Sequence, residues 1–188
     1  MAGKLFVVSG PSGAGKGTLL ARVLPQLEGI RVAVSVTTRQ PRIGEREGID
    51  YVFLSDAEFD ELIAEDGLLE WATVHSARYG TLKSEVFAAI ADGSDVVLEI
   101  DPQGARQIKD RYPQATLVFI EPPSLAELEY RLRTRGTESD SAITERLRTA
   151  AIEMDMIGDY EKVIVNDDLG VASDDLLNWI TAIRVEGA

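Results

Sequence analysis

Several kinds of residue are absent from this chain of 188 residues or scarce in it. It has no cysteine and a single histidine, which excludes disulfide bonds and metal sites built on thiolates. No apolar run approaches the length of a membrane-spanning helix, so we expect no contact with a membrane. The first residues lead directly into an apolar, strand-like segment, and we therefore expect no signal peptide and a cytoplasmic protein.

Positive charge is also scarce, and the formal net charge is −13. Such an excess of carboxylates argues against nucleic acid and anionic lipid as partners. The arginines nevertheless gather in two short segments, Arg39 to Arg46 and Arg131 to Arg148. Because guanidinium groups bind phosphates and carboxylates in bidentate geometry, two such clusters in an acidic chain predict a small anionic ligand. We expect small-molecule substrates, and the sequence leaves protein partners open.

The most informative segment that is present follows the apolar run Leu5–Val8 and reads G-P-S-G-A-G-K-G-T. It fits the G-x-x-x-x-G-K core of a phosphate-binding loop. Its glycines let several backbone N–H groups converge on one anion, and Lys16 brings a positive charge to the β- and γ-phosphates. The next helix adds the partial positive charge of its N-terminus. The residues predicted to bind ATP here are Gly10, Pro11, Ser12, Gly13, Ala14, Gly15, Lys16, Gly17 and Thr18.

The loop departs from the usual pattern at position 17, where glycine replaces serine or threonine. The hydroxyl of that residue ordinarily helps to hold Mg²⁺. Two alternatives stay open. Either Thr18 supplies a hydroxyl one residue later, or phosphates and water hold most of the ion, as Mg²⁺ tolerates.

Strand and helix patterns alternate along the chain. Unbroken apolar runs, Val96–Leu98 and Leu117–Ile120, are typical of strands buried on both faces of a parallel sheet. The alternation predicts an α/β fold with a doubly wound parallel sheet of the P-loop NTPase type, in which ligands bind beyond the carboxyl ends of the strands. The expected strands are Lys4–Ser9, Arg31–Val36, Leu69–His75, Asp95–Ile100, Thr116–Ile120 and Lys162–Val165. The expected helices are Lys16–Leu27, Asp56–Glu65, Lys83–Ala91, Ala105–Arg111, Leu125–Thr134, Ser141–Gly158 and Ser173–Val185.

Two polar stretches interrupt this alternation. Thr37 to Gly48 has the composition of a structured loop, and Thr134 to Asp140 separates two helical patterns and is suited to hinge a lid. No linker divides the chain into separate domains.

Further segments resemble one family. S-V-T-T-R-Q-P-R-I-G-E-R-E-G-I-D-Y, from Ser35 to Tyr51, closely resembles the nucleotide-acceptor segment of guanylate kinases. The same holds for L-E-W-A, R-Y-G-T, L-E-I-D-P-Q-G-A, R-L-R-T-R-G-T-E and V-I-V-N-D-D-L, at residues 69–72, 78–81, 98–105, 131–138 and 163–169. These segments follow the family's order over nearly the whole chain, so the chain is identified as a member of that family.

The resemblance implies an enzyme that uses ATP and Mg²⁺ to phosphorylate GMP or dGMP, giving ADP and GDP, and so recycles GMP toward GTP. It also implies one domain over residues 1–188. Within it we expect a core (about 1–33, 94–125 and 159–188), a GMP-binding lobe (about 34–93) and a lid (about 126–158).

The hydrogen-bonding groups along the edge of guanine explain which residues such an enzyme needs. Guanine offers donors at N1 and N2 and an acceptor at O6, so a carboxylate beside hydroxyls matches it and leaves adenine with unpaired groups, a discrimination of about 10⁴-fold. By resemblance, Glu70 and Glu99 are the carboxylates, and Ser35 and Thr81 the hydroxyls. We expect a solvent-filled cleft when no ligand is bound. The full GMP-binding set implied by the resemblance is Ser35, Arg39, Arg42, Glu45, Tyr51, Glu70, Tyr79, Thr81 and Glu99.

The resemblance also implies the groups around the transferring phosphoryl. Asp101 is expected near the Mg²⁺–phosphate centre, acting through water or by orienting an arginine rather than as a general base, because the acceptor oxygen is already anionic. Thr18 and Asp101 are the candidate Mg²⁺ residues, and Asn166 is expected near the base of ATP. The implied catalytic set is Lys16, Arg39, Asp101, Arg131, Arg135 and Arg146.

Two alternative functions stay open. A guanylate-kinase-like module that binds proteins without catalysis would be expected to have a degraded phosphate loop, whereas Lys16 and the lid arginines are present here. A sister kinase with another acceptor, such as a ribose bisphosphate, would not need the guanine-reading set.

Overall fold

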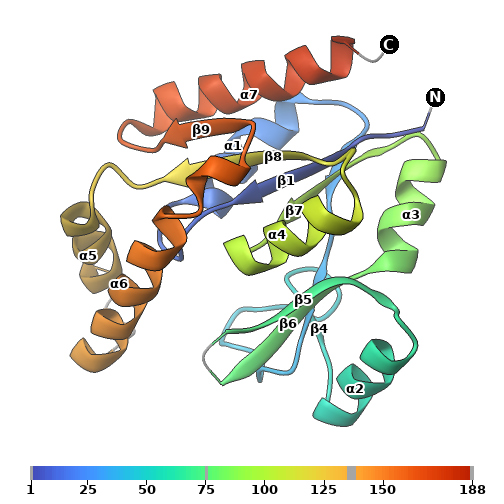
Figure 1. Ribbon diagram of the computed structural model, residues 1–188, viewed down its shortest axis with the longest axis horizontal. Coiled ribbons are helices and arrows are strands. Elements are labelled where there is room, and N and C mark those ends of the chain that lie inside the picture. The colour runs from blue at the N-terminus through green and yellow to red at the C-terminus, as the bar shows by residue number, and fades with distance from the viewer. Residues whose placement is uncertain (1, 75, 135–138, 187–188) are drawn as a thin grey trace.

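The computed structural model describes residues 2–74, 76–134 and 139–186 (Figure 1). Its helices are α1 Lys16–Val23, α2 Asp56–Ala64, α3 Lys83–Ala91, α4 Pro102–Arg111, α5 Leu125–Thr134, α6 Asp140–Met154 and α7 Leu169–Glu186. Its strands are β1 Leu5–Ser9, β2 Ile30–Val32, β3 Ser35–Thr37, β4 Val52–Phe53, β5 Leu68–Val74, β6 Ala77–Leu82, β7 Asp95–Glu99, β8 Thr116–Glu121 and β9 Lys162–Val165. Short 3₁₀ turns cover Leu24–Gln26 and Ile157–Asp159.

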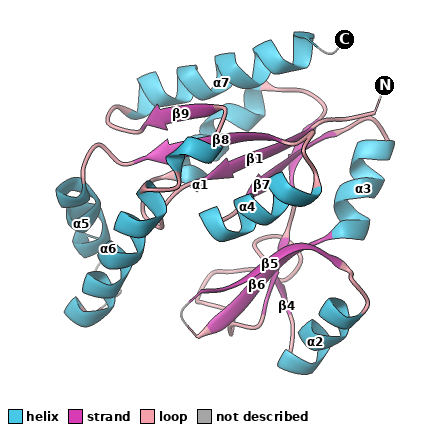
Figure 2. Ribbon diagram, in the orientation of Figure 1, coloured by secondary structure: helices cyan, strands magenta, loops and turns pink. Residues whose placement is uncertain are grey.

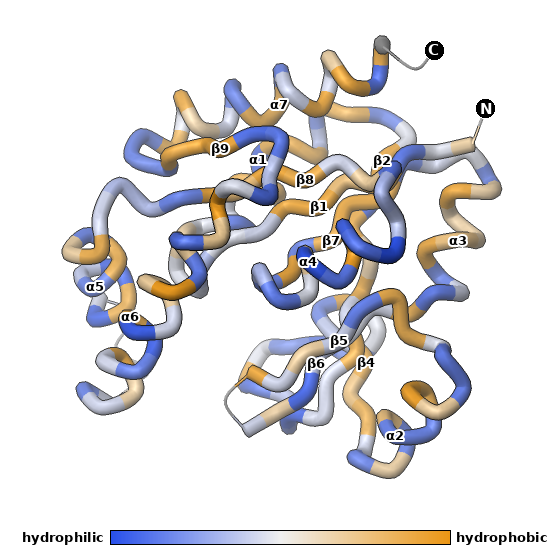
Figure 3. Tube along the Cα trace, in the orientation of Figure 1, coloured by the Kyte–Doolittle hydropathy of each residue, from blue (hydrophilic) through white to orange (hydrophobic). Residues whose placement is uncertain are grey.

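A parallel sheet with the order β2-β7-β1-β8-β9 forms the main layer. The apolar runs predicted to be strands lie at its centre, and Val97 and Val118 are fully buried. Helices α1 and α7 cover one face of this sheet, and α3 and α4 lie on the other (Figure 1). The orange segments of β1 and β8 in Figure 3 mark this apolar centre. The predicted α/β fold with a doubly wound parallel sheet is therefore confirmed.

A second sheet lies beside the carboxyl end of the first, with the order β4-β3-β6-β5 (Figure 2). Strand β6 pairs antiparallel with both β3 and β5, while β4 runs parallel to β3. Helix α2 covers one face of this sheet through Phe59, which is fully buried. Its ring packs edge-on against Trp71, with the ring centroids 6.4 Å apart. The sheet thus has its own small apolar core.

One predicted strand is wrong in an informative way. Arg31–Val36 was expected to be continuous, but it is divided between the two sheets as β2 and β3. The Ala33 N–H still donates to Val97 O in the main sheet at 2.9 Å, whereas Ser35 already pairs with Thr81 in the second sheet. The chain therefore crosses between the sheets at Val34. The sequence R-V-A-V-S-V has no turn residue at this point, so composition alone does not reveal the crossing.

Other differences concern short or capped elements. Strands β4 and β6 were not predicted, because the sequence of β6, A-R-Y-G-T-L, lacks an apolar alternation. Helix α4 begins at Pro102 rather than Ala105, since the Asp101 side chain accepts from the Gly104 N–H at 2.8 Å and caps the helix. Helix α7 begins four residues early, at Leu169. No helix in the described ranges is long and apolar enough to cross a membrane.

Candidate active site

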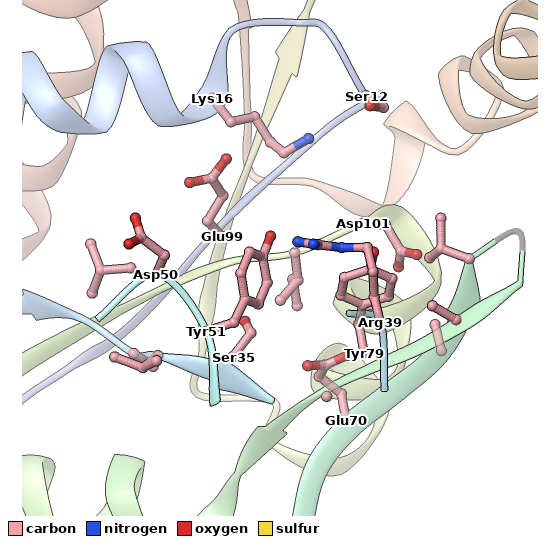
Figure 4. Close-up of a pocket in the computed structure, with 18 of the residues that line it drawn as sticks. Ser12, Lys16, Ser35, Arg39, Asp50, Tyr51, Glu70, Tyr79, Glu99 and Asp101 are labelled. Atoms are coloured by element: carbon pink, nitrogen blue, oxygen red, sulfur yellow. The ribbon is translucent and has the colours of Figure 1, made fainter. Parts of the chain in front are cut away.

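A cavity of about 820 Å³ lies where the carboxyl ends of β1 and β7 face the second sheet (Figure 4). It is the place that the fold class predicts for a ligand. The phosphate-loop segment, the end of β7, strands β3, β5 and β6, and helix α6 all contribute side chains to its wall. The predicted site residues that line it are Gly10, Ser12, Lys16, Ser35, Arg39, Arg42, Tyr51, Glu70, Tyr79, Glu99, Asp101 and Arg146.

The phosphate-loop segment has the backbone that its glycines predict. Gly10, Gly13 and Gly15 have φ values of 139°, 95° and 95°, in the region that favours glycine. At Gly10 a Cβ would come within 2.2 Å of Ile120 O, so no other residue fits there without a shift of the backbone. The Lys16 Nζ bends back and donates to Gly10 O at 2.6 Å and to Pro11 O at 3.2 Å. This places the lysine ammonium at the mouth of the loop.

Asn166 packs against this loop and donates a hydrogen bond to it. It is 5% exposed, and its Nδ2 donates to Ala14 O at 2.7 Å. A Cβ on Gly15 would lie 2.4 Å from the same nitrogen, so the loop glycine and the asparagine are closely packed. Asn166 is not among the described residues that line the cavity. Its predicted place near the base of ATP stays a prediction, while its observed contacts hold the loop in shape.

Two of the predicted guanine-reading residues meet at the far wall of the cavity. The Thr81 hydroxyl donates to Glu70 Oε1 at 2.7 Å, across the pairing of β5 with β6. Ser35 lies opposite Thr81 in the register of β3 with β6. A Cβ on Gly104 would come within 2.4 Å of Glu70 Oε2, so the absence of a side chain in α4 leaves room for the carboxylate. Three strands and one helix together position this group.

The environment of Glu70 differs from the solvent-filled cleft that the sequence predicts. Although the cavity itself is open, the Glu70 residue is only 4% exposed. Burial raises the pKa of the carboxyl from its ordinary value of 4.5 to about 7, and the charge of Asp101 adds to the rise. The hydrogen bond from Thr81 lowers the pKa but offsets only part of the effect of burial. A ligand that donates hydrogen bonds to this group would favour its charged form.

The loop from Thr37 to Gly48 is built around Arg39 and Glu45. Arg39 Nη1 and Nη2 donate to the two carboxylate oxygens of Glu45 at 2.8 and 2.9 Å. Arg39 Nε donates to the Tyr79 hydroxyl at 3.1 Å, and the guanidinium lies over the Tyr51 ring, 5.1 Å from its centroid. The Arg42 N–H also donates to Glu45 at 2.7 Å. Five members of the predicted GMP-binding set thus form one cluster, namely Arg39, Arg42, Glu45, Tyr51 and Tyr79.

The pairing of Arg39 with Glu45 strongly shifts the pKa of the Glu45 carboxyl. The hydrogen bond from Arg39 is the main cause that lowers the pKa of Glu45 to about 2; burial opposes it in part, and the hydrogen bond from the Arg42 N–H adds to the lowering. The same bond raises the pKa of Arg39 above its already high value. Glu45 is therefore an anion that orients Arg39, which explains its presence in a loop predicted to bind an anion.

The helices expected to form a lid pack on the phosphate-loop segment. A Cβ on Gly13 would lie 2.8 Å from Leu128 Cδ1 of α5, so the two segments touch. Arg131 of α5 donates to Glu127 Oε1 and to Asn166 O, both at 2.9 Å. Arg146 of α6 donates to Ser12 Oγ at 3.2 Å. The prediction for Arg135 falls on a residue outside the described ranges.

Asp101 and Glu153 both interact electrostatically with Lys16, and of these two only Asp101 was predicted. Burial raises the pKa of Asp101, while the Gly104 N–H and Lys16 lower it. Glu153 of α6 is 9% exposed and lines the cavity, and burial raises its pKa to about 7, against the lowering effect of Lys16. Sequence reasoning missed Glu153. The available signal was its position seven residues after Arg146, on the same face of the helix.

The remaining predicted residues lie near the start of α1. Thr18 is exposed and is not among the described residues that line the cavity. The Glu99 carboxylate lies beside Gly17, and its oxygens are 3.3 and 3.4 Å from the position that a Cβ on Gly17 would take. Glu99 thus faces the phosphate-loop segment, and neither of its oxygens has a described hydrogen bond to the Glu70–Thr81 pair.

Known proteins show which family has this architecture. The chain is 49% identical over 180 residues to the guanylate kinase of Desulfitobacterium hafniense, covering 96% of this chain and 90% of that one. It is 52% identical over 169 residues to the guanylate kinase of Gloeobacter violaceus, covering 90% and 82%. The crystal structure of guanylate kinase from Anaplasma phagocytophilum superposes with a TM-score of 0.80 at 34% identity, over 96% of this chain and 86% of that one. The guanylate kinase family model matches residues 2–183, and this chain belongs to the guanylate kinase family.

Proposed function

We propose that this chain transfers the γ-phosphoryl group of ATP to GMP or dGMP, forming ADP and GDP. One observation carries the proposal. A single cavity has the phosphate-loop lysine Lys16 on one wall and both Arg39 and Glu70 on the other. One cavity therefore offers a complementary group to each part of the substrates: Lys16 to the donor phosphates, Arg39 to the acceptor phosphate and Glu70 to the acceptor base.

Base recognition follows from the Glu70–Thr81 pair. An ionised Glu70 can accept the N1–H and N2–H of guanine, while hydroxyls of Ser35 and Thr81 are available to donate to O6. Adenine would present an unprotonated N1 to the carboxylate and leave buried groups unpaired, which disfavours it by about 10⁴-fold in sites of this kind. Glu99, the other predicted carboxylate, lies beside Gly17 instead.

Phosphate recognition uses the Arg39 cluster. Arg39, held by Glu45 and Tyr79, presents a guanidinium to the acceptor phosphate, and Arg42 and Tyr51 line the same part of the cavity. Fixing both phosphates in line accounts for much of phosphoryl transfer, since the acceptor oxygen needs no base. We propose that the lobe 34–93 and the lid 126–158 close on the core, bringing the guanidinium groups of Arg131, Arg135 and Arg146 to the transferring group. Closure also excludes water that would otherwise hydrolyse ATP.

The residues around Lys16 suit Mg²⁺, which prefers oxygen ligands and usually takes one or two carboxylates together with phosphates and water. Bound there, the ion would neutralise charge on the β- and γ-phosphates. We propose that Asp101 reaches it through water while its other role is to cap α4. Thr18 stays a candidate only if its exposed hydroxyl turns toward the nucleotide.

Substrate profiling tests the proposal. The purified protein is assayed with ATP and, in separate reactions, GMP, dGMP, AMP and a ribose bisphosphate. Efficient transfer to GMP and dGMP, with AMP lower by orders of magnitude, is the expected result. ATP alone should be hydrolysed very slowly. A folded protein that binds no nucleotide would favour the protein-binding alternative, and preference for the ribose bisphosphate would favour the sister kinase.

A further inference from the structure

We infer that Glu99 serves the donor phosphates and their Mg²⁺ rather than the guanine base, and that Gly17 is the residue that makes room for it. The inference rests on the proposed transfer from ATP to GMP and assigns a role within that same site. It changes what the resemblance implies for Glu99 and explains the unusual residue at position 17.

The main sheet places Glu99 beside the phosphate-loop segment. Glu99 is the last residue of β7, and it lies opposite Val8 of β1, the strand that leads into the phosphate-loop segment. Gly17 is the second residue of α1, which leaves that segment. The two residues are therefore brought together by adjacent strands of the rigid main sheet. Glu70 and Thr81, in contrast, belong to the second sheet.

The Glu99 carboxylate approaches Gly17 closely. A Cβ at position 17 would lie 3.3 and 3.4 Å from the two oxygens of Glu99. That is tighter than an ordinary contact with a side-chain carbon, so serine or threonine at position 17 would press on Glu99 as it stands. The long glutamate side chain thus occupies the space beside the loop that the usual hydroxyl-bearing residue would reach into.

Lys16 and Tyr51 are the neighbours of the Glu99 carboxylate in the cavity. In Figure 4 it points toward Lys16, and the ring of Tyr51 lies between it and Glu70. Burial raises the pKa of Tyr51, and the charges of Tyr79 and Glu99 add to the rise. Tyr51 itself stacks with Arg39 of the proposed acceptor-phosphate clamp. Glu99 consequently lies between the groups proposed to bind the donor phosphates and those proposed to bind the acceptor phosphate.

A carboxylate in that position would repel both phosphates unless a cation lay between them. Mg²⁺ is suited to that place, because it binds through carboxylate, phosphate and water oxygens. P-loop NTPases generally hold the ion with the hydroxyl after the loop lysine and with a carboxylate from a neighbouring strand. Here position 17 supplies no hydroxyl, and Glu99 supplies the carboxylate from β7. The residues present therefore fit Mg²⁺. Glu99 would bind the ion from the side of β7, either directly or through a water molecule bound to the ion.

Binding measurements without turnover separate the two roles. Calorimetry of Glu99→Gln, which keeps the size of the side chain and removes its charge, is done with a non-hydrolysable ATP analogue in the presence and absence of Mg²⁺. A separate titration uses GMP alone without metal. We expect the Mg²⁺-dependent gain in analogue affinity to fall by about tenfold or more, the scale of one lost charge-assisted contact. Metal-free GMP affinity should stay within about twofold of wild type.

Glu70→Gln is the matched control, since it removes the same group from the other wall of the cavity. It should show the opposite pattern, with weakened GMP binding and an unchanged Mg²⁺ dependence. If Glu99→Gln instead weakens metal-free GMP binding and leaves the Mg²⁺ gain intact, Glu99 reads the base and the inference is overturned. Wild-type protein that neither binds nor phosphorylates GMP would refute the proposed function itself, a result distinct from either pattern.

The packing of Gly17 gives a second, independent test. Gly17→Ser should weaken Mg²⁺-dependent analogue binding in the wild-type background, because the new side chain displaces the carboxylate. In a Glu99→Asp background, where the side chain is one methylene shorter, the same substitution should cost less or restore binding. Equal effects of Gly17→Ser in both backgrounds would show that the two positions do not share this space.

Discussion

Replacing Glu70 with glutamine is predicted to stabilise the ligand-free protein at alkaline pH, although it should damage GMP recognition. The reason is the burial of the carboxyl, which raises its pKa to about 7. At pH 8 the wild-type group is charged in a place where it has lost most of its water, and the Thr81 hydrogen bond only partly compensates. Glutamine keeps an oxygen for Thr81 and carries no charge.

The sign and size of the effect follow from proton binding. The folded state holds this proton more tightly than the unfolded chain, where the ordinary value is 4.5. Below that pH both states are protonated and the group has no pH-dependent effect. As the pH rises toward 7 the unfolded state loses its proton first, so stability falls, and above 7 the loss is complete. A rise from 4.5 to about 7, at about 1.4 kcal/mol for each pH unit, corresponds to about 3 kcal/mol.

Urea unfolding of both proteins between pH 4.5 and 8.5 measures this effect. The difference between the two unfolding free energies should shift in favour of Glu70→Gln by up to about 3 kcal/mol across the range. Other carboxylates are common to both proteins and cancel in the difference. Glu99→Gln removes one carboxylate at an exposed position and controls for the change in net charge. Parallel pH profiles for wild type and Glu70→Gln would refute the argument from burial.

Four further predictions concern the site. Binding of guanosine near pH 7 should release a proton in wild type but not in Glu70→Gln, as measured by calorimetry in buffers of different ionisation enthalpy. Lys16→Ala should abolish turnover with an unchanged circular dichroism spectrum, and activity within a few-fold of wild type would exclude its assigned role. Arg146→Ala should lower kcat far more than it raises the KM for GMP, and the reverse pattern in steady-state kinetics would place Arg146 at the acceptor. Glu45→Gln should raise the KM for GMP by about tenfold, because Arg39 loses the bidentate contact that orients it, and an unchanged KM would show that Arg39 needs no such support.

Local features of the site could be predicted from the sequence because they depend on neighbours in the chain. A strand, a glycine-rich turn and a helix in succession specify the phosphate-loop backbone, and the positive φ values of Gly10, Gly13 and Gly15 follow from it. The alternation of apolar runs with helices likewise predicts a parallel sheet. The motif and the resemblance together supplied the predicted site residues, and twelve of these line one cavity.

Features that join distant segments could not be predicted in this way. The crossing at Val34 divides an apolar run between two sheets, and nothing in its composition marks the point. Strand β6 has no apolar alternation because one of its faces lines the cavity. Glu153 joins the site only because α6 turns that face toward Lys16.

The sequence by itself therefore determined the phosphate loop, the α/β class and the family, since each depends on residues that are consecutive or in matching order. The tertiary structure alone decided the electrostatics. It buried Glu70 against Thr81 and Gly104, and it placed Glu99 beside Gly17. Strand order and register bring such groups together from positions many residues apart. The pKa of a carboxyl and the partner it serves depend on that three-dimensional neighbourhood, which one-dimensional periodicity does not contain.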